Sequence, residues 1–175
     1  MANTTFDGPV RSKNGFQSIG PGAAIALTLA TNLTVAAHAG RLLTMDPAGT
    51  PTAITLPTIN STADNPIAGP GSDPSNPNTV GTTFEILFTD EFTGTISTDG
   101  TDKFVGSLMV GVNDGAKKAF VPAAANDVVN LNGEGAGTSG GLIGSRVKFT
   151  AIADNQYMVE GLLIGTGTVV TPFSN

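Results

Sequence analysis

The fold is decided by the last third of the chain, residues 130–175, which read NLNGEGAGTSGGLIGSRVKFTAIADNQYMVEGLLIGTGTVVTPFSN. A glycine-rich loop opens this stretch, and an alternating run follows from Arg146 to Thr150. The chain turns at Asp154-Asn155 and returns through Tyr157-Met158-Val159. A period of two residues on both sides of such a turn predicts a β-hairpin. We see no catalytic chemistry in this stretch, which indicates a structural protein.

The composition of the whole chain favours strands and turns over helices. The 175 residues suit one compact domain with its own core. Charged residues make up only 13% of the chain, about half of the roughly 25% found in an ordinary soluble domain. The 23 glycines and 11 prolines suit short strands joined by many turns. A surface this poor in charge indicates a protein that faces a partner.

Charge and cysteine content exclude several classes of function. The formal net charge of −6, with eight scattered Lys and Arg residues, argues against a protein that binds nucleic acid. The chain has no cysteine, so disulfides and thiolate metal sites are excluded. The apolar run at 23–30 is far too short to span a membrane. We find no signal peptide at the start, and we expect the chain to be made and folded in a cytoplasm.

Residues 1–21 are expected to form an extended N-terminal arm. The apolar residues Phe6, Val10 and Phe16 are separated by Asp-Gly, Asn-Gly and Gly-Pro breakers, and Arg11 adds positive charge. One interpretation is a frayed terminus. The other is an arm that docks on a neighbouring subunit, since the two phenylalanines would otherwise lie in solvent.

Short alternating segments account for most of the remaining chain. Between Ile25 and Val35 the large apolar residues fall on odd positions, which predicts a strand, or a pair of strands with a break near Thr31-Asn32. The Asp99-Gly100 turn predicts a hairpin between Thr93–Ser97 and the strand that follows. Further strands are expected at Arg41–Met45, Ala53–Leu56, Thr82–Thr89, Leu108–Val112, Ala119–Val121 and Val128–Leu131.

The expected fold is all-β. We predict about nine to eleven strands and almost no helix, arranged as a single antiparallel β-sandwich or barrel-like domain over residues 22–175. The polar, proline-rich stretch at 58–79 is predicted to be a long loop that projects from this body.

Two patterns suggest enzymes, and neither is persuasive. The run from Gly135 to Gly140 matches the G-x-G-x-x-G of dinucleotide folds, and Glu160 lies about twenty residues beyond it. That site needs a helix after the glycines, whereas a strand pattern follows, so a flexible connection between strands is preferred. The single histidine, His38, would have to serve any Ser-His-Asp relay, and nothing in the sequence sets partners beside it. We therefore expect no enzymatic activity and no cofactor.

A calcium site is a weaker alternative. Asp73, Asp99, Asp102 and Asp114 lie in predicted turns, where carboxylates can converge on a hard cation. Their spacing does not follow the regular Asp-x-Asp-x-Asp-Gly pattern, so the sequence does not predict this site.

Seven short motifs along the chain share a family resemblance: Phe6–Phe16, Ile54–Pro57, Gly140–Gly144, Arg146–Phe149, Tyr157–Gly161, Gly165–Gly167 and Thr171–Ser174. Together they resemble small virion proteins of tailed bacteriophages, particularly phages of marine bacteria and cyanobacteria. Ser145 stands where that group commonly has an acidic residue, and Tyr157 stands where a tryptophan is usual.

The resemblance implies a structural protein on the capsid exterior that decorates or cements a lattice of major capsid protein subunits. The alternative is a head-fibre or tail appendage in which the loop at 58–79 binds host-surface glycans or receptors. A homo-oligomer is expected, with a trimer preferred. The residues expected to contact partners are the arm residues Phe6, Val10, Arg11 and Phe16, and Val169, Val170 and Phe173 of a terminal strand that can pair with a neighbouring chain.

Overall fold

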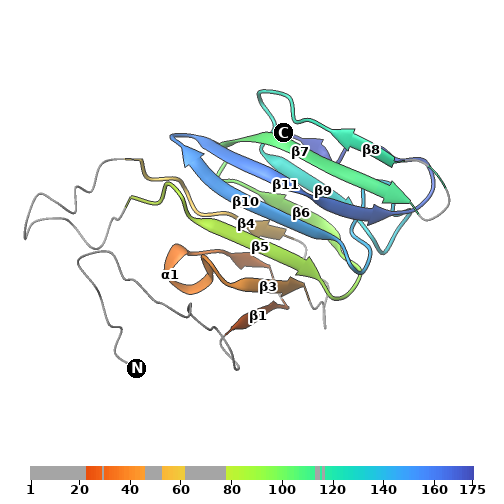
Figure 1. Ribbon diagram of the computed structural model, residues 1–175, viewed down its shortest axis with the longest axis horizontal. Coiled ribbons are helices and arrows are strands. Elements are labelled where there is room, and N and C mark those ends of the chain that lie inside the picture. The colour runs from red at the N-terminus through yellow and green to blue at the C-terminus, as the bar shows by residue number, and fades with distance from the viewer. Residues whose placement is uncertain (1–22, 29, 46–52, 62–77, 113–114, 116) are drawn as a thin grey trace, which may run out of the picture.

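The computed structural model describes residues 23–28, 30–45, 53–61, 78–112, 115 and 117–175. They form twelve β-strands and one helix of four residues (Figure 1), so the predicted all-β class is confirmed. The predicted arm and residues 62–77 of the predicted loop lie outside the described residues. The elements are β1 Ala24–Leu27, β2 Thr31–Asn32, α1 Val35–His38, β3 Leu42–Met45, β4 Ala53–Thr55, β5 Thr83–Phe88, β6 Thr93–Ser97, β7 Lys103–Val112, β8 Lys117–Phe120, β9 Val128–Asn132, β10 Arg146–Ala153, β11 Gln156–Gly165 and β12 Phe173–Ser174.

The strands form two hydrogen-bonded sheets. The larger sheet has seven strands in the order β1-β3-β5-β10-β11-β7-β8, and the smaller has five in the order β12-β9-β6-β4-β2. Both are mixed, because β1–β3, β3–β5, β7–β11, β2–β4 and β4–β6 are parallel pairs. The predicted antiparallel arrangement is therefore wrong. A period of two residues reports which side of a strand is buried and carries no information on the direction of the neighbouring strand.

The first six strands alternate between the two sheets. β1, β3 and β5 are neighbours in the larger sheet, and β2, β4 and β6 are neighbours in the smaller one. Each winding of the chain thus adds one strand to each sheet. The predicted pair of strands is present, but the break lies between Leu27 and Thr31, because Thr31-Asn32, the predicted position of the break, forms β2. The buried Leu27 and Leu33 lie on either side of the break. Val35, predicted to end this strand pair, instead begins α1.

The predicted C-terminal hairpin is confirmed. β10 and β11 are antiparallel and joined at Asp154-Asn155, where Asn155 has a φ of 58°, a left-handed conformation that asparagine tolerates well. In Figure 1 the hairpin lies in the middle of the larger sheet, where β10 pairs with β5 and β11 pairs in parallel with β7. It therefore connects the wound strands of the first half to β7 and β8.

The predicted hairpin at Asp99-Gly100 is wrong. β6 pairs with β4 and β9 in the smaller sheet, whereas β7 pairs with β11 and β8 in the larger one. The turn does form, since Gly100 has a φ of 89° and the Thr98 hydroxyl donates to the Asp102 carbonyl at 2.7 Å. It carries the chain from one sheet to the other. A tight turn therefore fixes a reversal of the chain, and the burial of the flanking side chains decides which strands pair.

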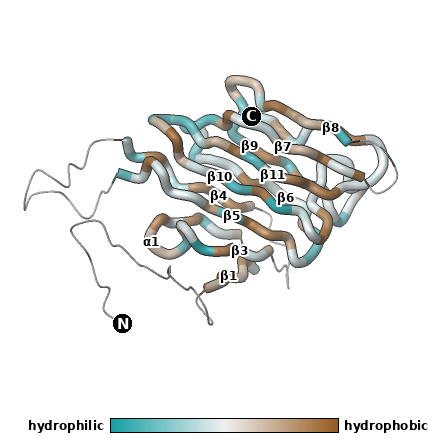
Figure 2. Tube along the Cα trace, in the orientation of Figure 1, coloured by the Kyte–Doolittle hydropathy of each residue, from teal (hydrophilic) through white to brown (hydrophobic). Residues whose placement is uncertain are grey.

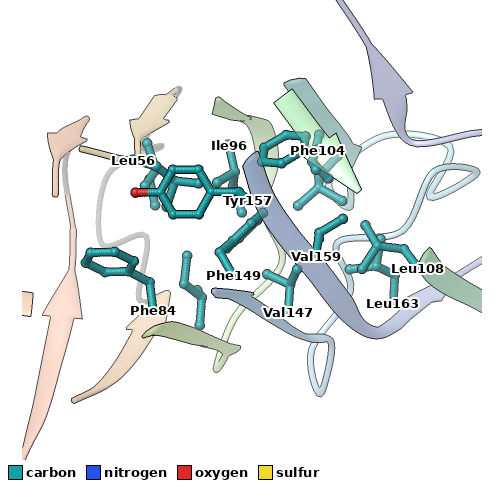
Figure 3. Close-up of a cluster of buried hydrophobic side chains, with 14 of the residues drawn as sticks. Leu56, Phe84, Ile96, Phe104, Leu108, Val147, Phe149, Tyr157, Val159 and Leu163 are labelled. Carbon is teal, nitrogen blue, oxygen red and sulfur yellow. The ribbon is translucent and has the colours of Figure 1, made fainter. Parts of the chain in front are cut away.

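Side chains from both sheets form one buried core. Figure 2 shows apolar segments on strands of both sheets, and the close-up in Figure 3 brings together Ile96 of β6, Phe104 of β7 and Phe149 of β10. The ring centroid of Phe104 lies 5.4 Å from the ring centroid of Phe149 and 6.5 Å from that of Phe173, which belongs to the smaller sheet. The contact between Phe104 and Phe173 joins the two sheets, whereas Phe104 and Phe149 pack within the larger sheet. The three predicted inward-facing residues of β5 are likewise buried.

Candidate functional site

The residues predicted to contact partners fall into two groups. Phe6, Val10, Arg11 and Phe16 of the arm lie outside the described residues. The other three lie near the C-terminal end, where the two-residue strand β12 pairs with β9 of the same chain. Val169 and Phe173 are buried in the chain's own core, and Val170 is 47% exposed. Of the three, only Val170 has a largely exposed side chain.

His38 has a local structural role. It lies at the exposed end of α1, and its Nδ1 accepts a hydrogen bond of 2.9 Å from the Thr34 amide. The Thr34 hydroxyl in turn accepts from the Ala37 amide at 3.3 Å and caps the first turn. Thr34 caps the same short helix that His38 ends, so the hydrogen bond to the imidazole stabilises this single helical turn.

The glycine-rich loop between β9 and β10 is tightly packed, and the expectation of a flexible connection is corrected. A Cβ atom on Gly133 would lie 2.4 Å from the Gly141 carbonyl oxygen, and one on Gly141 would lie 2.4 Å from the Phe92 carbonyl oxygen. The amides of Phe92 and Thr166 donate to carbonyls of this loop at 2.8 and 3.0 Å. The glycines are needed because backbone segments approach each other closely here. Strand β10 follows, as predicted.

The four aspartates considered as an alternative calcium site are brought together only in part. The Asp102 amide donates to Asp99 Oδ1 at 3.1 Å, so these two residues are neighbours. Asp73 and Asp114 lie outside the described residues. Within the described part of the chain, no group of three or more His, Cys, Asp or Glu residues could hold a metal ion.

The two aspartates differ in their electrostatics. Burial raises the pKa of Asp102; a hydrogen bond from the Ile59 amide opposes this shift, and the nearby charge of Asp99 adds to it. Asp102 is fully buried, and its Oδ1 has no hydrogen-bond partner among the described residues. Burial alone would raise the pKa of Asp99, but hydrogen bonds from the Asp102 amide and the Thr58 hydroxyl outweigh it and lower that pKa.

The same region fixes the base of the predicted loop at 58–79. The Thr79 amide donates to the Asn60 carbonyl at 2.9 Å, and the Asn60 amide donates to the Thr79 hydroxyl at 2.8 Å. Asp102 accepts from the Ile59 amide at 2.9 Å, and the buried Tyr157 donates its hydroxyl to the Pro57 carbonyl at 2.7 Å. These hydrogen bonds join residues 57–60 and Thr79 to one another and to the body, and we call this group the stem.

An exposed apolar surface lies on the outer face of the larger sheet, the side that points away from the core. Met109 of β7 and Leu162 of β11 are register partners, and each is 47% exposed. They line an open hollow of about 690 Å³, which we call the outer groove. Its lining residues are Met109, Gly111, Val112, Lys117, Leu142, Leu162, Ile164, Gly165 and Thr166.

This apolar surface was not predicted from the sequence, although the sequence carries a signal for it in two apolar runs. A strand with one solvated face alternates apolar and polar residues, whereas Leu108-Met109-Val110 and Leu162-Leu163-Ile164 are apolar without a break. Such runs indicate a strand that is covered on both faces. In the described structure only one face of β7 and β11 is covered, by the core.

Charged side chains beside the groove largely neutralise one another. Arg146 Nε lies 2.7 Å from Glu85 Oε1, and Lys148 Nζ lies 2.9 Å from Glu160 Oε1. Lys117 stands on the rim opposite Gly111, and none of the ion pairs found among the described residues involves it. The charged side chains of this face are the three basic and two acidic residues just named. The face therefore carries about one positive charge, on a chain whose net charge is −6.

Comparison with known proteins gives no relative: no family model, no curated protein and no solved structure matches this chain. The described residues include no helix with the length and apolar character needed to cross a bilayer. The surface chemistry is therefore what supports a functional proposal.

Proposed function

We propose that this chain is a virion structural protein of a tailed bacteriophage that decorates or cements the capsid by bridging major capsid protein subunits. It acts on the capsid exterior after synthesis in the host cytoplasm, as a homo-oligomer with a trimer preferred. Its role is non-enzymatic, and it binds neither nucleic acid nor membrane. For the body, whose two sheets share one core, we propose the finer description of a β-sandwich.

The observation that carries this proposal is the apolar outer face of the larger sheet. Met109 and Leu162 leave nearly half of their side-chain surface in solvent, on a chain with only 13% charged residues. Large contiguous apolar surfaces on a folded protein mark sites of contact with other proteins. Covering such surfaces between neighbouring copies, at many repeated sites, suits a protein that forms a layer over a shell of identical subunits.

A pelleting assay with shells of the cognate major capsid protein tests this role. The full chain should sediment with the shells at a fixed ratio of copies per capsid subunit and should raise the temperature at which the shells break. A chain that begins at Gly20 should lose attachment while keeping its far-ultraviolet circular dichroism spectrum. Full-length protein that stays in the supernatant at every concentration would contradict the proposal.

The alternative is a head-fibre or tail appendage that binds host-surface glycans or receptors. The fixed stem favours it, because Ile59 and Asn60 at one end of the loop and Thr79 at the other are held by hydrogen bonds to one another and to the body. A stem of this kind suits a loop used for recognition. Binding to a glycan array or to host cells that is lost when residues 62–77 are shortened would favour this alternative, whereas binding to shells that survives the same change would favour the first.

A further inference from the structure

We propose that copies of this chain bind one another head to tail, with the outer groove of one copy covered by an acidic, apolar end of the next. We define the acidic end as Asp90, Glu91, Glu134 and Ile143. The inference deepens the proposed function, because it names the two surfaces through which the proposed homo-oligomer forms. It assigns the outer groove to a second copy of the chain and leaves the capsid contact to other surfaces.

The receiving surface is apolar at its centre and basic at its rim. In register across three strands, Ala119 of β8 stands beside Met109 of β7, and Met109 stands beside Leu162 of β11. Gly111 lines the same hollow without a side chain, and a Cβ atom there would meet only Leu162 Cδ1, at 3.9 Å. Lys117 stands at the edge next to Gly111, so an acidic group that enters the groove meets its ammonium group.

The inserting surface has complementary chemistry. Ile143 is 57% exposed and lies beside the turn after β5, because the Gly144 amide donates to the Phe88 carbonyl at 2.9 Å. Asp90 and Glu91 are exposed in that turn. Glu134 joins them, since its amide donates to the Thr93 hydroxyl at 2.9 Å. An exposed aliphatic residue and three exposed acidic residues thus lie on loops that these hydrogen bonds hold together.

The charges of this chain favour a contact between different faces. The outer face carries about +1, so the rest of a chain with a net charge of −6 carries about −7. Two copies meeting groove to groove would set Lys117 near Lys117, and most other pairings would set acid against acid. The groove meeting the acidic end sets opposite charges together and leaves an apolar centre to be buried, which is the pattern of an electrostatically matched interface.

Most of the other acidic residues of the described strands and turns are already engaged; Asp154, exposed in the β10–β11 turn, is the exception and lies outside both surfaces. Glu85, Asp127 and Glu160 form ion pairs within the chain. Asp99 accepts hydrogen bonds from the Thr58 hydroxyl and two backbone amides. None of the ion pairs found in the described part of the chain involves the carboxylates of the acidic end.

The placement of the two surfaces favours a closed ring. Leu142 lines the groove, and its neighbour Ile143 belongs to the acidic end, so the two surfaces meet at one corner of the body. A contact between two different surfaces produces either a ring or a filament. Surfaces that meet at a corner require a large rotation from one copy to the next, which closes a ring after few copies. This is compatible with the proposed trimer.

Charge reversal with rescue tests the inference on the purified full-length chain, without capsids. Sedimentation velocity at low salt should show an oligomer for the natural chain. Lys117→Glu alone and Glu91→Lys alone should each weaken self-association by about tenfold or more, as expected when an interface loses a desolvated charge pair. The double variant should recover it. Arg41→Glu and Asp154→Lys make the same charge changes at exposed residues outside both surfaces and should leave the oligomer unchanged.

Several results would overturn the inference: a natural chain that is monomeric, single reversals without effect, or a double variant that stays dissociated. Circular dichroism and a cooperative urea transition identify variants that fail to fold, and Glu91→Lys lies in an exposed turn where folding is least at risk. Binding to shells is measured separately. An oligomer that responds as expected but ignores shells removes the capsid role alone, and shell binding by a chain that never self-associates removes this inference alone.

Discussion

The first half of this fold, strands β1 to β6, which we call the wound half, is built by different rules from the second half, strands β7 to β12. From β1 to β6 the chain passes back and forth between the sheets, and every neighbouring pair within those six strands is parallel. The β10–β11 hairpin is local, with a turn of only two residues, Asp154 and Asn155. The first half needs contacts that are distant in sequence, whereas the hairpin is specified within twenty residues of chain. Local contacts form at a smaller entropic cost.

The position of the hairpin shows how the halves depend on each other. It lies between β5 and β7, so the larger sheet is continuous only when the hairpin is in place. The smaller sheet has a corresponding junction where β9 pairs with β6. We infer that the hairpin completes a body that the wound strands begin, and that damage to its core destabilises both halves.

The largest expected effect comes from removing the aromatic centre of the hairpin. Phe149 is fully buried and packs on Phe104 of β7. Phe149→Ala should lower the free energy of unfolding by about 3–5 kcal/mol, because it leaves a cavity between the sheets. Urea denaturation followed by circular dichroism measures this, and both halves should unfold in a single transition.

Ile152→Ala is the matched control for Phe149→Ala. Ile152 lies in the same strand at a register irregularity and is 40% exposed, so its truncation should change the free energy of unfolding by less than about 0.5 kcal/mol. Two separate transitions in Phe149→Ala would show that the wound half is stable without the hairpin, which contradicts the dependence inferred above.

The comparison also explains which parts of the fold the sequence could predict. The hairpin was predictable because its turn and both of its strands are contiguous, and alternation assigned its buried face. The parallel pairs were not predictable, since nothing in Ile54 or Ile96 indicates that their strands are neighbours in register. The prediction from the Asp99-Gly100 turn was wrong for the same reason. The turn specifies that the chain reverses its direction, but it does not specify which sheet the next strand joins.

The candidate site was less predictable than the fold. Val169 and Phe173 were expected to face a partner, but an apolar side chain near the end of a chain serves its own core equally well. The outer groove depends on Met109 and Leu162, which are 53 positions apart in sequence and become neighbours only through the parallel β7–β11 pair. A single sequence reveals apolar runs that lack alternation, and only the topology places them side by side.

Tyr157→Phe sharpens the comparison by removing one link between the halves. The Tyr157 hydroxyl donates to the Pro57 carbonyl, which follows β4 in the wound half, and the side chain is fully buried. The change should lower the free energy of unfolding by about 1–2 kcal/mol, because it removes the donor to a partly buried carbonyl. Urea denaturation at pH 7 checks this. An unchanged midpoint would show that water replaces the hydroxyl and that the link contributes nothing.

Asp102→Asn tests the crossover at which the winding ends. Since burial raises the pKa of Asp102 in the folded chain, the folded state binds this proton more tightly than the unfolded state, whose ordinary value is 3.8. Its contribution to stability is therefore present below that value and is lost as the pH rises through the folded pKa. Asparagine does not ionise, so the stability of the variant relative to the natural chain should increase from pH 4 to pH 7.

Urea denaturation at several pH values measures this difference. Glu134→Gln, which removes an exposed carboxyl in the β9–β10 loop, is the control and should show a much smaller change over the same interval. A difference between the natural chain and Asp102→Asn that stays constant from pH 4 to pH 7 would mean that Asp102 keeps an ordinary pKa despite its burial.

The smallest expected effect lies in the hairpin turn and separates local specification from core packing. Asn155 has a φ of 58°, while its carbonyl accepts a hydrogen bond of 2.9 Å from the Lys103 amide, which any residue at this position keeps. Asn155→Ala should therefore lower the free energy of unfolding by about 1 kcal/mol, because a Cβ atom is strained in the left-handed region. Asn155→Gly should stay within about 0.5 kcal/mol of the natural chain, because glycine adopts this conformation freely. Equal losses in both variants would show that the asparagine side chain, and not its backbone conformation, specifies the turn.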